Sequence, residues 1–326
     1  MVNSVVLDLE QRPISPDQPP VGFLATWSLT NCKVQRGALD LALTAAGLHK
    51  YLPPAPSTYL VTRHALEQFA ADHRVQGTDE RTLVRGNQKN GPYAEFAVVA
   101  EHLEGFTYQV NIRVRLEKAT GTITCVQGNT GPLDLAVNDP ALSAAIQPYI
   151  DRNRNLFLTS DVATMLAHIL TEECKAINIG HDGTYFVPQS SAALIQSLKT
   201  VVAQIPATDP YLSAIPILNS VQGRQESAKG IHDGFLAQLA RMQTDLDDLA
   251  KCKQGTVRPA TVGRRLKQYQ DVAERAEFYR DLLQIRADEI LDKVKGLRIA
   301  AKAVLLSDAV ADDQPAPAPL PLPEAA

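Results

Sequence analysis

A long series of apolar residues near the C-terminus constrains the fold more than any other feature of the sequence. Between residues 262 and 304, apolar side chains recur at steps of mostly three and four residues. The mean step is about 3.5 residues, which is the repeat of helices that pack along a single seam. A similar series runs from about residue 225 to residue 253 and includes Ile231, Phe235 and Leu239. The two series predict two long, coiled-coil-like helices.

A short connection joins these two predicted helices, and it contains Gly255 and Pro259. Helices joined so closely most simply fold back on each other as an antiparallel hairpin. At 1.5 Å per residue the first helix spans roughly 43 Å and the second roughly 67 Å, which leaves an overhang of about 24 Å near residues 291–305. We expect this overhang to pack on the preceding part of the chain, with pairing to another subunit as the alternative.

The chain before the hairpin mixes helices and strands. Val110, Ile112, Val114 and Leu116 alternate with polar residues, which predicts a strand with one solvent-facing side. The neighbouring stretches YAEFAVVAEHLEG and TITCVQG predict a strand on each side of it, and hence an antiparallel meander. The remaining strands are expected in VGFLATWSL, INI and TYFVP, and helices over 35–53, 57–74, 139–151, 160–176 and 191–205. Without a sustained βαβ alternation, this order predicts an α+β fold.

The predicted organisation has four parts. A Pro-rich, disordered leader covers residues 1–20, an α+β body covers 21–221, the helical hairpin covers 222–305, and a disordered, acidic, Ala/Pro-rich tail covers 306–326. The net charge of −4 is unevenly distributed, because the hairpin is basic while the tail is acidic. Positive charge is therefore concentrated in one helical segment.

The sequence also bears on the compartment. It has no basic and apolar leader typical of secretion, and no apolar run long enough for a membrane span. Its four cysteines are far apart and form no C-x-x-C pair, which favours reduced thiols. We therefore expect a cytoplasmic protein without membrane partners.

The common catalytic motifs are missing from the sequence. His181 and Asp182 lie between two glycines, which is typical of a hairpin turn. His232 with Asp233 is expected on a solvated helix surface. His168 and Glu172 have the i, i+4 spacing of a surface pair and lack a third metal ligand. We predict no catalytic residue, metal site or cofactor, and a non-enzymatic role is favoured.

The connection between the long helices carries the principal candidate site. Its basic residues lie in a stretch that has no acidic residue between Asp248 and Asp271. Two of them fall in the predicted first turn of the second helix, where the helix dipole favours acids, so an external anion is one interpretation. The alternative is that the charges extend into solvent along the hairpin. The candidates are Lys251, Lys253, Arg258, Arg264, Arg265 and Lys267.

A weaker candidate is the polar stretch RTLVRGNQKNG, residues 81–91. It contains Arg81, Arg85 and Lys89 and precedes the predicted meander. An anion-binding loop and a solvated connector are both open interpretations.

Several stretches resemble an uncharacterised bacterial and bacteriophage protein family of unknown function. They are WSL at 27–29, ALDLALTAAGL after it, GTYFVP at 183–188 and AEFYRDLLQ in the second long helix. The resemblance extends over roughly residues 22–305. It implies no activity and no functional residue, and it suggests a setting linked to phages or mobile elements.

The favoured function is that of an interaction protein whose basic hairpin tip contacts an acidic partner, either a nucleic acid or a protein. A structural subunit that self-assembles through the hairpin is one alternative, and a homo-oligomer is then expected. An enzyme with dispersed active-site residues in the α+β body is the other.

Overall fold

The computed structural model describes residues 19–73, 80–87, 91–102, 107–128, 138–180, 183–251, 259–283, 285 and 287–312, part of them by backbone alone. The chain forms two compact units. The helical unit contains residues 1–27, 168–199 and 212–326, and the meander unit contains residues 28–167 and 200–211. This division differs from the predicted body over 21–221 and hairpin over 222–305, because residues 168–199 group with the long helices.

The mixture of helices and antiparallel sheets confirms the α+β class. In chain order the elements are β1 (Gly22–Thr30), β2 (Lys33–Gln35), α1 (Arg36–Ala45), η1 (His49–Tyr51), α2 (Thr58–Asp72), β3 (Glu80–Asn87), β4 (Tyr93–His102), β5 (Thr107–Glu117), β6 (Ile123–Gln127), α3 (Pro140–Asn153), β7 (Leu156–Leu158), α4 (Thr159–Glu172), β8 (Ile177–Asn178), β9 (Tyr185–Pro188), η3 (Gln189–Ser191), α5 (Ala192–Ala203), β10 (Thr208–Ile217), α6 (Val221–Ala250), α7 (Pro259–Leu283) and α8 (Asp288–Asp312). Within the described part of the chain, no helix is both long and apolar enough to cross a lipid bilayer.

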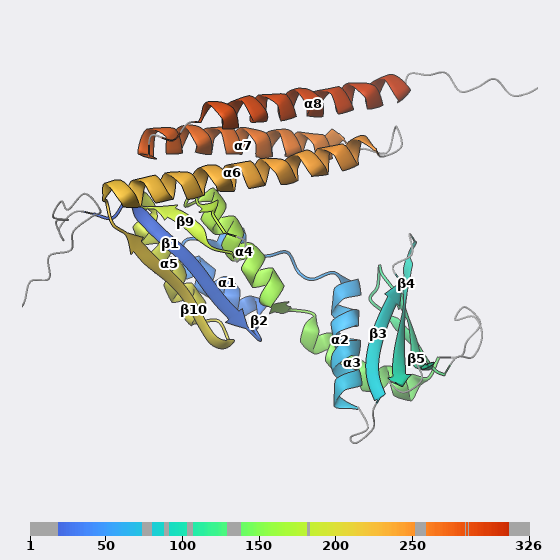
Figure 1. Ribbon diagram of the computed structural model, residues 1–326. Helices are drawn as coiled ribbons and strands as arrows, with labels where there is room; N and C mark the ends of the chain where they lie inside the picture. Colours follow the sequence, from blue (N-terminus) through green and yellow to red (C-terminus); the bar gives the residue numbers. More distant parts are fainter. Residues whose placement is uncertain are drawn as a thin grey trace, which may run out of the picture. The chain divides into compact units, whose positions relative to one another are not determined.

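The sheet of the helical unit has the strand order β10-β1-β9-β8. Strand β1 pairs with β9 in an antiparallel register that runs from Gly22↔Pro188 to Ala25↔Tyr185. Strands β8 and β9 also pair antiparallel, as predicted for INI and TYFVP. The helices α6, α7 and α8 lie side by side next to this sheet (Figure 1).

The single second helix predicted over 262–304 is wrong, because the chain breaks it into α7 and α8. Ile285 and Ala287 lie between the two helices and are buried, so the break is itself packed into the core. Asp288 and Glu289 then occupy the first turn of α8, where acids are favoured by the helix dipole. The long coiled-coil hairpin is therefore replaced by three helices.

Side-chain pairs fix the directions of these helices. Arg265 on α7 pairs with Asp245 on α6, and Arg275 further along α7 reaches Gln238 earlier on α6, so α6 and α7 are antiparallel. Arg298 on α8 donates to Gln270 on α7. Helix α8 thus reverses direction and packs back along α7, and the predicted 24 Å overhang does not form.

The three helices share one core with the sheet. Its most buried members come from α6, α7, α8 and strands β8 and β9. Leu291 lies at the edge of this cluster, while Ile290, Val294, Leu297 and Ala301 are buried within it. The described part of residues 291–305 therefore packs along α6 and α7 within its own unit, rather than on the preceding α+β body as expected.

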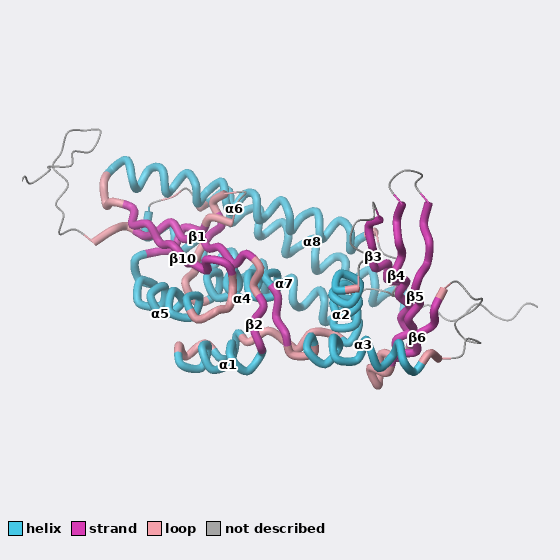
Figure 2. Tube along the Cα trace, turned by 90° about the horizontal axis from the view of Figure 1, so that it is seen from below, coloured by secondary structure: helices cyan, strands magenta, loops and turns pink. Residues whose placement is uncertain are grey.

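In the meander unit, four strands in the order β3-β4-β5-β6 form an antiparallel meander. The predicted three strands are confirmed, and β3 is added to them. Strand β3 pairs with β4 from Glu80↔His102 to Asn87↔Glu95, so residues 81–87 of the stretch 81–91, for which a loop or connector was predicted, form a strand. Helices α2 and α3 pack on one face of this sheet (Figure 2), and their shared core includes Phe69, Phe96 and Ile146.

Helix starts follow ordinary capping chemistry. The Ser57 hydroxyl accepts from the Leu60 backbone N–H at the start of α2, where the helix predicted over 57–74 also begins. Asp139 caps α3 by accepting from two backbone N–H groups, and Ser220 caps α6 by accepting from Gly223. These local signals explain why helix starts could be predicted more reliably than the long-range pairing of β2 with β7.

Candidate anion-binding site

The structure describes four of the six basic residues of the predicted tip, and they differ in their surroundings. Lys251 ends α6, and its ammonium pairs with Asp248 at 3.0 Å on the exposed surface. Lys253 and Arg258 lie outside the described residues. Helix α7 begins at Pro259, so Arg264 and Arg265 lie beyond its first turn, and the expected conflict with the helix dipole is wrong.

Arg264 and Arg265 differ in their surroundings. Arg264 is exposed, whereas the Arg265 guanidinium lies 2.8 Å from the Asp245 carboxylate on α6 and 3.2 Å from the Gln268 side-chain oxygen. The acid that balances Arg265 comes from the preceding helix, just upstream of the acid-free stretch. A search for acids within that stretch alone misses this pairing.

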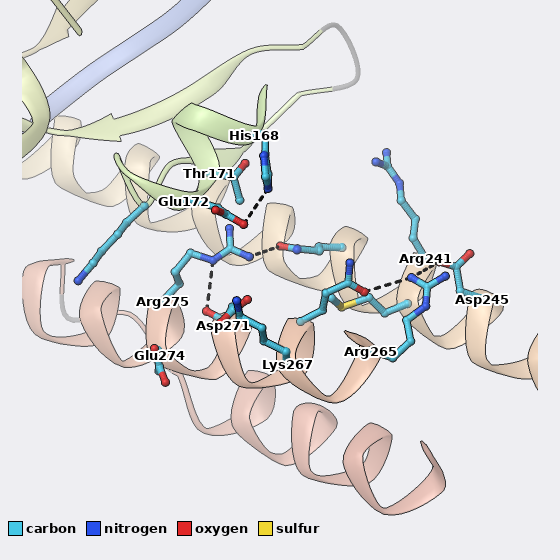
Figure 3. Close-up of a pocket in the computed structure, with 14 residues that line it drawn as sticks. His168, Thr171, Glu172, Arg241, Asp245, Arg265, Lys267, Asp271, Glu274 and Arg275 are labelled. Atoms are coloured by element: carbon cyan, nitrogen blue, oxygen red, sulfur yellow. Dashed lines mark hydrogen bonds and ion pairs between the residues drawn. The ribbon is translucent and has the colours of Figure 1, made fainter. Parts of the chain in front are cut away.

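A cavity of about 530 Å³ in the helical unit brings Arg265 and Lys267 together with residues of α4 and α6. Figure 3 shows the side chains around it. The volume lies within the range of roughly 300–1,000 Å³ typical of small-ligand sites. Its lining contains His168 and the charged residues Glu172, Lys175, Arg241, Asp245, Arg265, Lys267, Asp271, Glu274 and Arg275.

Arg275 is the most unusual residue of this cavity, because its side chain is charged yet only 8% exposed. Its guanidinium donates to the backbone oxygens of Asp271 and Ala176, each at 3.3 Å, and to the Gln238 side-chain oxygen at 3.4 Å. Figure 3 shows it reaching from α7 toward α4 and α6. Among the described residues no carboxylate forms an ion pair with it.

The electrostatics of Arg275 follow from this burial. Removal from water lowers the pKa of the guanidinium, while Tyr279, Asp271 and Glu172 act in the opposite direction. The Tyr279 hydroxyl donates to the Lys175 backbone oxygen at 2.8 Å, which ties α7 to the segment after α4. Arg275 is thus held in place chiefly by neutral oxygen atoms.

A second cavity of about 290 Å³ adjoins the first. The two share Thr171, Gln238, Arg241 and Arg275 in their linings. The second one is otherwise lined by residues of the β8–β9 region and the middle of α6, among them Asn178, Tyr185 and Asp233. Arg275 therefore lies at the boundary between a highly charged cavity and a less charged one.

The other predicted pairs stay at the surface. His168 and Glu172 are 2.8 Å apart on exposed positions of α4, and the described residues contain no cluster of three potential metal ligands. His232 lies 3.7 Å from Asp233 and 3.6 Å from Glu289 on α8. His181 and Asp182 lie outside the described residues.

The weaker loop candidates lie in the meander unit, as far as the structure describes them. Arg85 is an exposed residue of β3 in the meander unit, Arg81 lies on the same strand, and Lys89 lies outside the described residues. None of the described residues of the meander unit lines either cavity.

Of the cysteines, Cys32, Cys125 and Cys174 are free and buried, in agreement with the predicted reduced thiols.

Sequence reasoning missed Arg275, Arg241 and Lys175. Lys175 follows α4 and is distant in sequence, so only the fold brings it to the cavity. Arg275 did leave a signal, because it is three residues after Val272 and four before Tyr279, on the buried side of its helix. A charged residue on an apolar helix face is a candidate for a specific role.

Comparison with families of known proteins gives a match over most of the chain. A family described as "Family of unknown function (DUF6744)" matches residues 20–312. No curated protein and no solved structure matches the chain.

Proposed function

The chain belongs to the DUF6744 family of unknown function, and from that premise we propose that it binds a small ligand carrying a carboxylate or phosphate group. The ligand occupies the cavity between the end of α4, α6 and α7. The observation that carries the proposal is Arg275, a buried cation that lines both cavities and pairs with no carboxylate among the described residues.

Burial of an unpaired charge is costly, and buried cations in proteins are usually paired with an anion. Three neutral oxygen acceptors meet the hydrogen-bonding needs of Arg275 in part, but they carry no full negative charge. A bound carboxylate or phosphate supplies that charge, and a guanidinium binds such groups through two parallel hydrogen bonds.

Two further cations support an anion at this position. Arg241 and Lys267 line the first cavity, both are exposed, and neither forms an ion pair with a described residue. Of the acids in the lining, Asp245 is engaged by Arg265 and Glu172 by His168. Asp271 and Glu274 also line the cavity, so a compact anion fits better than an extended polyanion.

Ligand-induced stabilisation tests the proposal, since a ligand that binds only the folded state raises the melting temperature. Inorganic phosphate and citrate at millimolar concentrations are the probes, with chloride at matched ionic strength as the reference. We expect phosphate or citrate to raise the melting temperature. Lys267→Ala and Arg241→Ala should weaken the effect without loss of folding, because both side chains are exposed.

Lys295→Ala is the matched control, because Lys295 is an exposed cation on α8 outside both cavities. It should leave the response to phosphate and citrate unchanged. Equal responses of wild type, Lys267→Ala and Lys295→Ala would show that the anions act on the general surface, and the proposal would then fail.

The setting of this function is a further part of the proposal. We further propose a cytoplasmic location and a role linked to phages or mobile elements. Both rest on features of the amino-acid sequence. The identity of the neighbouring genes tests the second, because recurrent placement beside phage or transposition genes is expected.

A further inference from the structure

The second cavity adds features that narrow the class of ligand. It continues from Arg275 toward the sheet and is lined on that side by Tyr185 on β9 and by Ile179. The Trp27 ring stacks on Tyr185, with ring centroids 5.4 Å apart and an interplanar angle of 28°. An aromatic side chain that is itself fixed by stacking is a suitable surface for a flat ring of a ligand.

Polar groups of two kinds accompany this aromatic residue. The Asn178 side-chain oxygen accepts from the Gly180 backbone N–H, which leaves its amide N–H₂ available as a donor. The Asp233 carboxylate lines the same cavity from α6 and is well exposed. A carboxylate accepts hydrogen bonds from vicinal hydroxyls, which is how ribose is commonly recognised.

Resting on the proposed function, we propose that the ligand is a nucleotide. Its phosphate binds Arg275, with Arg241 and Lys267 close by, and its nucleoside occupies the second cavity. The base lies against Tyr185 and the ribose hydroxyls donate to Asp233. The two cavities supply, in adjoining positions, a buried cation, an aromatic ring, an amide donor and a carboxylate acceptor.

Trp27 gives a direct readout, because it is the only tryptophan of the chain and stacks on Tyr185. Its emission is followed while the protein is titrated with inorganic phosphate, adenosine, and the monophosphates of adenosine, guanosine, cytidine and uridine. At least one nucleotide should change Trp27 emission and bind about tenfold or more tightly than phosphate, as stacking on an aromatic side chain adds affinity.

Variants separate the parts of the site. Asp233→Asn should weaken the ribonucleotide about tenfold and leave its 2′,3′-dideoxy analogue unchanged. Tyr185→Leu should weaken every nucleotide and leave phosphate binding intact, with circular dichroism to confirm folding. Asp292→Asn, an exposed change on α8 outside both cavities, is the control and should alter none of these affinities.

The outcomes distinguish this inference from the proposed function. If phosphate or citrate binds and no nucleotide binds more tightly, the nucleotide inference is overturned while anion binding stands. Loss of binding by every anion overturns both. Equal weakening of the ribonucleotide and its dideoxy analogue by Asp233→Asn would overturn the assignment of ribose to Asp233.

Discussion

Tyr269 and Tyr279 are both fully buried on α7, but within the described part of the chain only the Tyr279 hydroxyl has a hydrogen-bond partner. The Tyr279 hydroxyl donates to the Lys175 backbone oxygen at 2.8 Å. The Tyr269 hydroxyl has no partner among the described residues. Ten residues apart on one helix, the same side chain is therefore satisfied in one place and not in the other.

Opposite effects on stability follow for the two Tyr→Phe substitutions. Tyr279→Phe should lower the free energy of unfolding by about 1–2 kcal/mol, because it leaves the Lys175 oxygen without its donor. Tyr269→Phe should raise it by about 1 kcal/mol, because it removes a buried hydroxyl without a partner. Urea unfolding of both variants measures the difference, and a destabilised Tyr269→Phe would contradict the unpaired state of that hydroxyl.

Tyr279 also predicts a dependence of stability on alkaline pH. Burial raises the pKa of its hydroxyl, so the unfolded chain loses this proton at lower pH than the folded one. The resulting stabilisation is fully present below the unfolded pKa of about 10, and it is lost as the pH rises toward the folded value. Urea unfolding between pH 8 and 11 should therefore show a decline that is smaller in Tyr279→Phe.

An exposed tyrosine supplies the control for this pH dependence. Tyr211 is 52% exposed, and Tyr211→Phe should retain the alkaline decline of the wild type. Parallel pH profiles of wild type and Tyr279→Phe would contradict the role given to Tyr279.

Two glycines on α6 predict a matched pair of effects. At Gly234 an added Cβ would collide with the Asn178 backbone oxygen and lie 2.8 Å from the Ile177 side chain, so Gly234→Ala should cost about 1–3 kcal/mol. At Gly230 the nearest atom belongs to Ile179 at 3.6 Å, an ordinary contact. Gly230→Ala should be neutral or stabilise by up to about 1 kcal/mol, since alanine favours helix. Thermal unfolding of both variants checks the contrast.

Much of the fold could be predicted because its signals are local. The strand around Ile112 and the start of a helix at residue 57 both depend on neighbouring residues, and both predictions are confirmed. The break between α7 and α8 escaped prediction because Ala287 and Ile290 continue the apolar spacing across it. A regular repeat thus concealed a reversal of the chain, and only the packing of α8 against α7 distinguishes the two outcomes.

The candidate site was less predictable for a related reason. Arg265 and Lys267 belong to a basic stretch of the sequence, yet the residues that complete their cavity come from α4 and α6 as well as α7. The polar residues and Gly86 within 81–91 favour a loop or connector, although residues 81–87 pair with β4 as part of strand β3. Both features depend on contacts between different segments of the chain, and the residue pattern within one segment does not reveal such contacts.

Nucleic-acid binding by the predicted tip stays a prediction and has its own test. Lys251→Glu with Arg264→Glu should weaken any binding of a fluorescently labelled single-stranded oligonucleotide and reduce its salt dependence. Lys229→Glu with Lys295→Glu changes the net charge equally at exposed positions away from the tip, and it should have little effect. Absence of anisotropy change for the wild type at low salt would remove the nucleic-acid hypothesis.

The reversal between α7 and α8 also affects how such experiments should be designed. Helix α8 starts beside His232 of α6 and runs in the same direction as α6, so it ends near the last turn of α6 and the first turns of α7. A purification tag or dye fused after the last helix would therefore be introduced next to Lys251 and Arg264. Attachment ahead of Gly22, where Val21 pairs with Ile217 at the other end of α6, leaves those cations unobstructed.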